Sequence, residues 1–307
     1  MKRSLLSLAF MSSIIVTAAC GENNEEQGEG NPSNDDETFE VAVIPSQSIG
    51  EMEEGLSSLE DHLSKQLSTP VEVTHYPNYN AVVEAINYSH VDLAYFGPVT
   101  YLIAYEQSGA EAVVTQSIDG NPYYYSYIVT QPDAPWDSLD ELLKNVDEVD
   151  FAFGSQSSTS GFTIPGYELM ERNVYENEGS YEFSSVRFTG SHDITANAVA
   201  NGDVDAGAID SAIFQALINE GAIEEDDYKI IWESQQLYQY PWAVPHDTED
   251  DRKDQIREAF LMIEDEEILS IFGGADEFVE ASHEEYDSIL EAARTMGLLD
   301  PEEDEDN

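Results

Sequence analysis

Three consecutive hydroxyl side chains, Ser158, Thr159 and Ser160, have the types and spacing that could bind an anion. They follow an apolar stretch over 151–154, which predicts a strand, and they precede a predicted helix over 163–174. The first turn of a helix presents backbone N–H groups that lack intrahelical acceptors, at the positive end of the helix dipole. With three hydroxyl donors beside it, such a turn predicts an anion site. A simple serine or threonine N-cap explains the same residues without a ligand.

A second polar segment, Gly190-Ser-His192-Asp193, stands at the start of another predicted helix. A histidine at a helix N-terminus can donate a hydrogen bond to an anion. The other interpretation is a histidine of the cap region that bonds only to backbone. The strand predicted over 204–209 ends in Asp210, which is either a ligand contact or a loop carboxylate.

Aromatic residues accompany these segments. The apolar run over 91–96 ends in Gly97-Pro98 and predicts the edge of a cleft, although core and turn account for it equally well. Tyrosines supply an apolar wall and one hydroxyl each, so we expect some of them to be core and some to line a site. The residues in question are Tyr76, Tyr79, Tyr123, Tyr124, Tyr125, Tyr238, Tyr240 and Trp242.

The elements that position these residues alternate along the chain. Apolar periodicity predicts strand, helix, strand, helix, strand over 39–96, with leucines at helical spacing over 52–67. Strands and helices alternate again between 139 and 209, and the strand over 123–130 is long enough to cross between two lobes. This pattern predicts α/β lobes with largely parallel sheets, whose ligand lies at the carboxyl ends of the strands. We assign 38–126 plus 233–307 to lobe 1 and 127–232 to lobe 2.

The N-terminus predicts export. Lys2 and Arg3 precede an apolar stretch over 5–16 that is short for a membrane span, and small residues then lead to Cys20. This resembles a lipoprotein signal peptide over 1–20, which implies lipidation at Cys20 and an extracytoplasmic protein anchored to the cell membrane. A plain secretory signal is the alternative. Residues 21–37 lack aromatic side chains and predict a flexible tether.

Charge and cysteine content exclude several classes of function. The 307 residues carry 64 Asp and Glu against 11 Lys and Arg, a formal net charge of −53, which disfavours nucleic acid and anionic lipid as partners. The acidic residues are spread along the chain, which favours a surface adapted to high salt over an acidic docking tail. With one cysteine, an internal disulfide and a cysteine-based metal site are excluded.

Taken in order, the Ser-Thr-Ser-Gly turn, Gly-Ser-His-Asp and Val204-Asp-Ala-Gly-Ala-Ile-Asp210 resemble the PhnD family over most of 39–275. Members of this family are the phosphonate, phosphite and phosphate-binding proteins of ABC importers. The resemblance implies a two-lobe, type II periplasmic-binding-protein fold that closes on its ligand, with an ABC permease as partner. It assigns the phosphorus oxyanion to Ser158, Thr159, Ser160, His192, Tyr124 and Tyr79.

Two positions depart from the family pattern. Members that bind aminoalkylphosphonates use carboxylates for the ligand amine, and those positions fall near Ala212 and Tyr240, neither of which is acidic. Asp210 lies close by and could serve instead. An aromatic distal wall that includes Tyr240 would suit a small or alkyl-bearing ligand such as phosphite or methylphosphonate.

Other functions stay open. We find no Gly-x-Ser-x-Gly elbow, P-loop or zinc motif, so we expect no catalysis, no cofactor and no metal. A binding protein for a sulfonate or an organic anion would share the architecture, and so would a ligand-sensing partner of a membrane receptor. We expect a monomer that binds a small anion and meets the membrane only through its anchor.

Overall fold

A computed structural model describes residues 38–300 of the chain. The predicted signal peptide with Cys20, the tether over 21–37 and the acidic end over 301–307 lie outside the described residues. Among the helices of the described part, none has the length and apolar character needed to span a bilayer.

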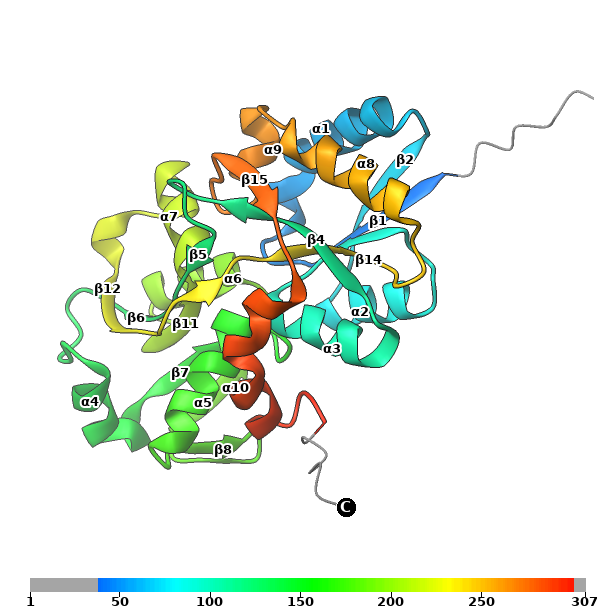
Figure 1. Cartoon of the computed structure of the whole chain (residues 1–307). Coiled ribbons are helices and arrows are strands. Elements are labelled where there is room, and N and C mark those ends of the chain that lie inside the picture. Colours follow the sequence, from blue (N-terminus) through cyan, green and yellow to red (C-terminus); the bar gives the residue numbers. More distant parts are fainter. Residues whose placement is uncertain (1–37, 301–307) are drawn as a thin grey trace, which may run out of the picture. The chain divides into compact units, whose positions relative to one another are not determined.

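A mixed sheet of six strands forms the first lobe (Figure 1). Its strands are β1 (Phe39–Val43), β2 (Val71–His75), β3 (Leu93–Tyr95), β4 (Glu111–Ser117), β14 (Pro241–Val244) and β15 (Glu277–Glu280). They lie in the order β15-β4-β14-β3-β1-β2. β1 runs parallel to β2 and β3, whereas β14 is antiparallel to β3 and β4. The predicted alternation over 39–96 is confirmed.

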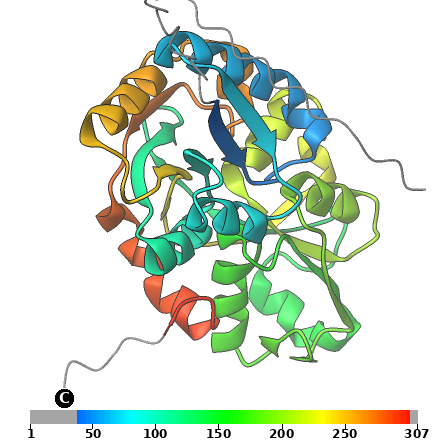
Figure 2. The ribbon, with the colours of Figure 1, turned by 90° about the vertical axis from the view of Figure 1, so that its right-hand side faces the viewer.

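Helices cover this sheet because their apolar positions recur every three or four residues. They are α1 (Ile49–Leu67), α2 (Tyr79–Asn87), α3 (Pro98–Ser108), α8 (Asp250–Leu261) and α9 (Glu266–Ser270). In α1 the predicted stripe of Leu56, Leu59, Leu63 and Leu67 is buried. α1 lies against α8 and α9, and Figure 2 shows these blue and orange helices together at one end of the described part.

A second sheet of five strands forms the other lobe. Its strands are β6 (Ser126–Thr130), β7 (Asp150–Phe153), β10 (Ser185–Phe188), β11 (Ala206–Asp210) and β12 (Lys229–Glu233). They lie in the order β10-β7-β11-β6-β12. β7 is parallel to β10 and β11, and β6 is antiparallel to β11 and β12. Each sheet thus contains parallel strands and an inserted antiparallel one.

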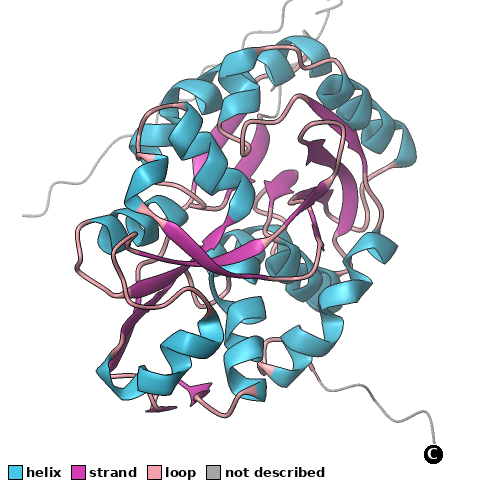
Figure 3. Ribbon diagram, turned by 90° about the vertical axis from the view of Figure 1, so that its left-hand side faces the viewer, coloured by secondary structure: helices cyan, strands magenta, loops and turns pink. Residues whose placement is uncertain are grey.

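The second sheet is also flanked by helices, which Figure 3 shows in cyan around the magenta strands. The remaining elements of this lobe are α4 (Leu139–Leu142), η1 (Leu143–Glu148), η2 (Thr159–Thr163), α5 (Ile164–Glu171), the hairpin β8 (Tyr175–Asn177) and β9 (Ser180–Tyr181), α6 (His192–Ala200), α7 (Ser211–Asn219) and η3 (Glu225–Asp227). Their apolar sides pack in clusters separate from the core of the first sheet.

The chain passes between the sheets twice, and the two passages run side by side. The outgoing passage is β5 (Tyr123–Tyr124) followed by β6, and the return is β12 followed by β13 (Leu237–Tyr238). β5 pairs with β13 and β6 with β12, both antiparallel. The single strand expected over 123–130 is therefore two short strands interrupted at Tyr125. The two-lobe α/β class is confirmed, whereas the residue boundaries of the lobes stay a prediction.

The C-terminal elements η4 (His283–Ile289) and α10 (Leu290–Thr295) follow β15. Met296 and Leu298, just beyond α10, pack against an apolar cluster of the second lobe. The last elements therefore bridge from the first sheet to α5.

The sequence did not predict α3, α7, β14 or β15. α3 is apolar on most of its surface, so its helical period is hidden. α7 begins directly after β11 because the Asp210 carboxylate accepts hydrogen bonds from the N–H groups of Ala212 and Ile213 and caps the helix, leaving no loop as a boundary signal.

Candidate binding site in the interlobe cleft

The hydroxyl turn, residues 158–160, follows the carboxyl end of β7 and begins the π-helical stretch η2. Ser158 Oγ accepts a hydrogen bond from Gly161 N at 3.0 Å, so this serine is the N-cap. A Cβ atom on Gly161 would lie 2.9 Å from Ser158 Oγ and 3.1 Å from His192 Cε1. Glycine thus lets the turn and the imidazole approach each other, which confirms that these two predicted segments meet.

The other two hydroxyls of the turn do not cap the helix. Thr159 Oγ1 accepts a hydrogen bond from Val99 N in the first lobe at 2.9 Å, which leaves its own proton available to donate. Ser160 Oγ lies 3.4 Å from Asp210 Oδ2. Thr159 and Ser160 are also the first residues of the helix, where backbone N–H groups lack intrahelical acceptors. The turn therefore offers hydroxyl and backbone donors in one place.

His192 begins α6 and is 1% exposed. Its backbone N–H donates to Ser46 O at 3.0 Å, in the loop after β1 of the other lobe. Nδ1 accepts from Asp210 N at 3.2 Å, so the proton of the neutral ring is on Nε2, which donates to the Tyr240 hydroxyl at 3.3 Å. Burial lowers the pKa of His192 to about 4, against the opposing influence of Asp193, so the ring is neutral at physiological pH.

The hydroxyls of Tyr79 and Tyr124 lack satisfactory hydrogen-bond partners among residues 38–300, although both are fully buried. The Tyr79 hydroxyl lies close to Ser158, and that of Tyr124 lies close to Ser160 and Thr159, but the angles or distances are unsuitable. Burial raises the pKa of both phenols, with Asp210 adding to it, so both remain protonated donors. Buried polar groups are rarely left unpaired, and two such donors beside one turn indicate a place for an acceptor.

Asp210 is the carboxylate at the centre of these residues and is 1% exposed. Oδ1 accepts from the N–H groups of Ala212 and Ile213 at 2.8 and 3.0 Å, while Oδ2 faces Ser160. Burial raises the pKa of Asp210 to about 6, and hydrogen bonds from Ile213 N, the Tyr240 hydroxyl, Ala212 N and the Ser160 hydroxyl oppose the shift. In the described part of the chain, no salt bridge reaches this carboxylate.

The sequence therefore identified residues that the fold brings together. All eight side chains proposed for ligand contact are at most 2% exposed: Tyr79, Tyr124, Ser158, Thr159, Ser160, His192, Asp210 and Tyr240. They converge because β1, β3, β7 and β11 end at the cleft, where parallel strands present their carboxyl ends. Whether they bind a ligand stays a prediction.

Hydrogen bonds join the two lobes across the cleft, so the described conformation is closed. Besides the bonds of Thr159 and His192 to the first lobe, Ser157 Oγ donates to Asn80 Oδ1 at 2.7 Å, and Ser48 Oγ donates to Asp193. α2 and α6 thus lie at an edge of the cleft where the two lobes are joined.

Comparison with known proteins shows which proteins share this sequence pattern and architecture. Residues 41–286 match the family described as the periplasmic phosphonate-binding proteins of ABC transporters. The "Phosphate-import protein PhnD" of Mycolicibacterium smegmatis is 31% identical over 73% of this chain and 70% of its own length. The "Phosphonates-binding periplasmic protein" of Escherichia coli is 24% identical over 84% of this chain and 73% of its own length. The structure of PhnD1 from Prochlorococcus marinus in complex with methylphosphonate aligns with a TM-score of 0.76 and 25% identity, covering 86% of this chain and 100% of that one.

The chain belongs to this family of periplasmic substrate-binding proteins.

In this member of the family, a narrow space lies beside Asp210, whose Oδ2 faces Ser160 of the hydroxyl turn. Its empty volume of about 200 Å³ is too tightly lined to admit a water molecule. Asp210, Ala212 and Tyr240 line it together with Gln116 and Gln239. The resemblance led us to look for an amine-binding carboxylate near Ala212 and Tyr240. Both residues line this space without supplying an acidic group, and Asp210 is the carboxylate that lines it.

Gln116 and Gln239 were missed by the sequence analysis. Gln116 Nε2 donates to the Tyr95 hydroxyl at 2.9 Å and to Gln239 Oε1 at 3.2 Å, whereas Gln116 Oε1 and Gln239 Nε2 lack partners within 38–300. In the sequence, Gln239 stands between Tyr238 and Tyr240, and an amide beside these two tyrosines was the available signal. Gln116 lies near the end of β4, and its burial could not be read from the sequence period.

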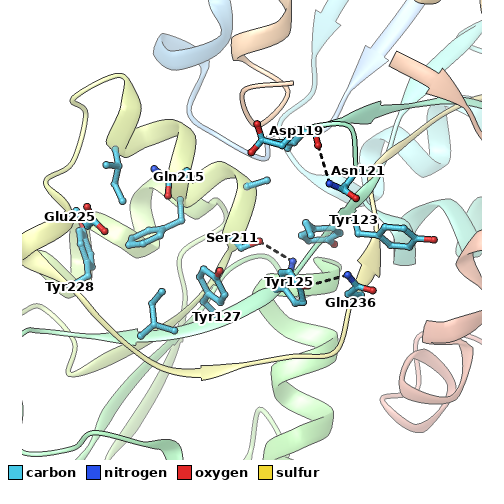
Figure 4. Close-up of a pocket in the computed structure, with 16 residues that line it drawn as sticks. Asp119, Asn121, Tyr123, Tyr125, Tyr127, Ser211, Gln215, Glu225, Tyr228 and Gln236 are labelled. Carbon is cyan, nitrogen blue, oxygen red and sulfur yellow. Dashed lines mark hydrogen bonds between the residues drawn. The ribbon is translucent and has the colours of Figure 1, made fainter. Parts of the chain in front are cut away.

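A larger hollow lies elsewhere, beside β6 and α7 (Figure 4). This outer groove has an empty volume of about 1350 Å³, which includes open solvent. Tyr125, Tyr127, Phe214 and Tyr228 line it, and Ser211 Oγ accepts from Tyr125 N at 2.9 Å. Of the convergent buried donors, Tyr124 borders this groove, whereas the hydroxyl turn and His192 do not, so we place the binding site in the cleft rather than here.

Proposed function

We propose that this protein captures a small phosphorus oxyanion, a phosphonate, phosphite or phosphate, between its lobes and delivers it to an ABC permease in the cytoplasmic membrane. The observation that carries the proposal is the pair of buried, unpartnered phenol hydroxyls of Tyr79 and Tyr124 beside the hydroxyl turn. The names of its relatives, which include a phosphate importer and a protein solved with methylphosphonate, support the choice of ligand class.

Neutral donors hold the ligand in this proposal. His192 is uncharged, and the contacts of Thr159 and Ser160 come from hydroxyls and the backbone. A desolvated oxyanion is stable in such a site when each oxygen meets donors, since hydrogen bonds to a charged group are stronger than neutral ones. A chain with a net charge of −53 can therefore bind an anion through local contacts, while high external salt screens the long-range repulsion.

Calorimetry and thermal shift in molar salt test the ligand class. Phosphite, phosphate, hypophosphite, methylphosphonate and 2-aminoethylphosphonate are compared with a sulfonate and an organic anion, because a ligand that binds the folded state raises the melting temperature. We expect at least one phosphorus oxyanion to bind at a stoichiometry of one without turnover. Binding of the sulfonate or the organic anion alone would refute the proposal.

The location of the protein in the cell is part of the same proposal. Cys20 carries the lipid that anchors an extracytoplasmic monomer to the cell membrane, with residues 21–37 as tether. Replacing Cys20 by Ser is expected to release the protein from the membrane fraction while leaving ligand binding intact. Retention of the Cys20→Ser protein in the membrane would contradict the lipid anchor.

A further inference from the structure

The carboxylate of Asp210 poses a physical problem for an oxyanion site. Oδ2 lies 3.4 Å from the Ser160 hydroxyl, which belongs to the turn that binds the oxyanion in the proposed function. The same carboxylate lines the narrow space next to the turn. A carboxylate and an oxyanion that share a buried site repel one another unless a proton lies between them.

The groups around Asp210 cannot supply a compensating positive charge. His192 and Asp193 approach from α6, Tyr79 from α2, Tyr95 from β3 and Tyr124 from β5, while Tyr127 and Tyr240 complete the set. Burial raises the pKa of each of these tyrosines and lowers that of His192, so these phenols and the imidazole are neutral near pH 7. The Asp193 carboxyl is bonded to the Ser48 and Ser191 hydroxyls.

Hydrogen bonding holds one oxygen of Asp210 firmly and the other only weakly, although the Tyr240 hydroxyl also reaches the carboxyl group. Oδ1 is occupied by the two backbone N–H groups of α7, so its geometry is fixed by the helix cap. Oδ2 faces the turn at a distance of 3.4 Å from Ser160 Oγ, which is a long and therefore weak contact. This oxygen can accept a further proton from a ligand without disturbing the cap.

We propose that Asp210 shares one proton with the bound ligand and so selects phosphorus oxyanions that carry a P–OH group over sulfonates, which carry none. The inference rests on the proposed function. A phosphonate monoanion donates its proton to the ionised carboxylate, and the other oxygens accept from the hydroxyl turn and the tyrosines. A sulfonate has no proton to donate, so it binds only when Asp210 has first taken one from solution.

The selectivity must therefore depend on pH with a defined sign. Burial raises the pKa of Asp210 to about 6, so its carboxyl is protonated below this pH and ionised above it. The sulfonate loses about fivefold in affinity in the first unit above pH 6, because the protonated fraction of Asp210 falls from about one half to about one eleventh, and the loss approaches tenfold per unit at higher pH. The phosphonate keeps its own proton to near-neutral pH, because the second ionisation of such groups lies there. The ratio of the phosphonate affinity to the sulfonate affinity thus rises with pH above about 6 and does not change with pH below it.

Methylphosphonate and methanesulfonate are the matched probes, because they share the methyl group and the tetrahedral centre. Calorimetry in molar salt measures both affinities between about pH 5 and 7 for the full chain and for Asp210→Asn. For the natural protein we expect the methylphosphonate-to-methanesulfonate affinity ratio to rise about fivefold between pH 6 and 7. Asparagine keeps the cap through its amide oxygen, so Asp210→Asn should fold, bind methanesulfonate independently of pH, and lose about tenfold in methylphosphonate affinity.

A matched control removes a carboxylate from the outer groove. Glu225→Gln makes the same change of charge at a lining residue of that groove and should keep the natural ratio and slope. A flat ratio in the natural protein, or an unchanged slope in Asp210→Asn, overturns the inference while the proposed function stands. Failure of Asp210→Asn to bind methanesulfonate also overturns it. If the natural protein binds no phosphorus oxyanion at any pH, the proposed function fails, and the inference fails with it.

Discussion

The outer groove and the interlobe site differ in size and in chemistry. The groove has an empty volume of about 1350 Å³, open to solvent, whereas the narrow space beside the hydroxyl turn measures about 200 Å³. In the groove, the Tyr125 hydroxyl is paired, since it accepts a hydrogen bond from Gln236 Nε2 at 3.1 Å. The cleft holds the unpaired hydroxyls of Tyr79 and Tyr124. We therefore place the predicted binding site by its unsatisfied buried donors and not by volume.

Tyr124 lines the groove as well as the cleft, and Ala212 lines both the groove and the narrow space. The two hollows are therefore neighbours separated by few side chains. This closeness makes substitutions in the groove suitable controls for substitutions in the cleft. Ser211 and Tyr125 of the groove serve in this way as controls for Thr159 and Tyr79 of the cleft.

The largest expected effect concerns the neutral state of His192. Its folded pKa is about 4, below the unfolded value near 6.5, so the neutral ring contributes stability above pH 6.5 that is lost as pH falls towards 4. We expect the unfolding free energy of the natural protein, relative to His192→Gln, to fall by about 3 kcal/mol over this range. Urea unfolding at a series of pH values measures the difference.

Asp210 provides a comparison of opposite sign. Its folded pKa of about 6 lies above the unfolded value, so protonation contributes stability at low pH that is lost as pH rises through 6. Relative to Asp210→Asn, the natural protein should therefore gain stability on acidification. The unfolding free energy of the natural protein is thus compared with that of His192→Gln and that of Asp210→Asn. If both differences changed with pH in the same way, burial would not set the charge of these two residues.

The second prediction concerns Thr159→Val. Valine keeps the shape but removes the hydroxyl that accepts from Val99 N and can donate to a ligand oxygen. We expect the affinity for the bound phosphorus oxyanion to fall by about 1–3 kcal/mol, since a charged acceptor loses a donor and a bond between the lobes is lost. Calorimetry at high salt measures it. Ser211→Ala, which removes a groove hydroxyl bonded to Tyr125 N, should leave the affinity unchanged.

Most of the fold could be predicted from the sequence because its elements obey simple periods. The stripe of Leu56, Leu59, Leu63 and Leu67 defined α1, and the polar segment with His192 and Asp193 marked the start of α6. α3 and β14 were missed since they are apolar on most sides, and a buried element has no polar face from which to read a period. The strand expected over 123–130 was too long. Tyr125 N donates to Ser211 Oγ, so Tyr125 does not pair with a neighbouring strand and separates β5 from β6.

The candidate site was partly predictable for a different reason. The hydroxyl turn and His192 stand at helix starts, which local sequence marks clearly. Gln116 and Gln239 could not be recognised, because their burial depends on the packing of β4 beside the return segment, far away in the chain. Asp210 was recognised as a strand-end acid, but its role as the cap of α7 appears only with the fold.

The third prediction is a change with opposite effects on stability and binding. The Tyr79 hydroxyl lacks a partner within 38–300, so Tyr79→Phe should leave stability unchanged or raise it by about 1 kcal/mol. The same variant should bind the oxyanion about 5- to 20-fold more weakly, because one donor is gone. Tyr125→Phe in the groove removes a paired hydroxyl and should change affinity little. A loss of stability in Tyr79→Phe with normal binding would assign its hydroxyl to the fold alone.

The smallest expected effect concerns closure of the cleft. Asn80 Oδ1 accepts from Ser157 Oγ at 2.7 Å, and these residues lie on opposite lobes. Asn80 is exposed, so Asn80→Ala removes this bond without opening a cavity. Ligand affinity depends on the population of the closed state, and a bond present only in that state contributes to it. We therefore expect up to about fivefold weaker binding, equivalent to about 1 kcal/mol, with no change in its pH dependence.

Asn87→Ala is the matched control, because Asn87 Nδ2 donates to Gln107 Oε1 at 2.6 Å within the first lobe. That bond is equally present whether the lobes are open or closed, so its loss should leave affinity unchanged. Calorimetry separates the two variants under one set of conditions. If Asn80→Ala and Asn87→Ala bind alike, the contact between Asn80 and Ser157 does not contribute to closure, which then depends on the other bonds across the cleft, those of Thr159, His192 and Asp193.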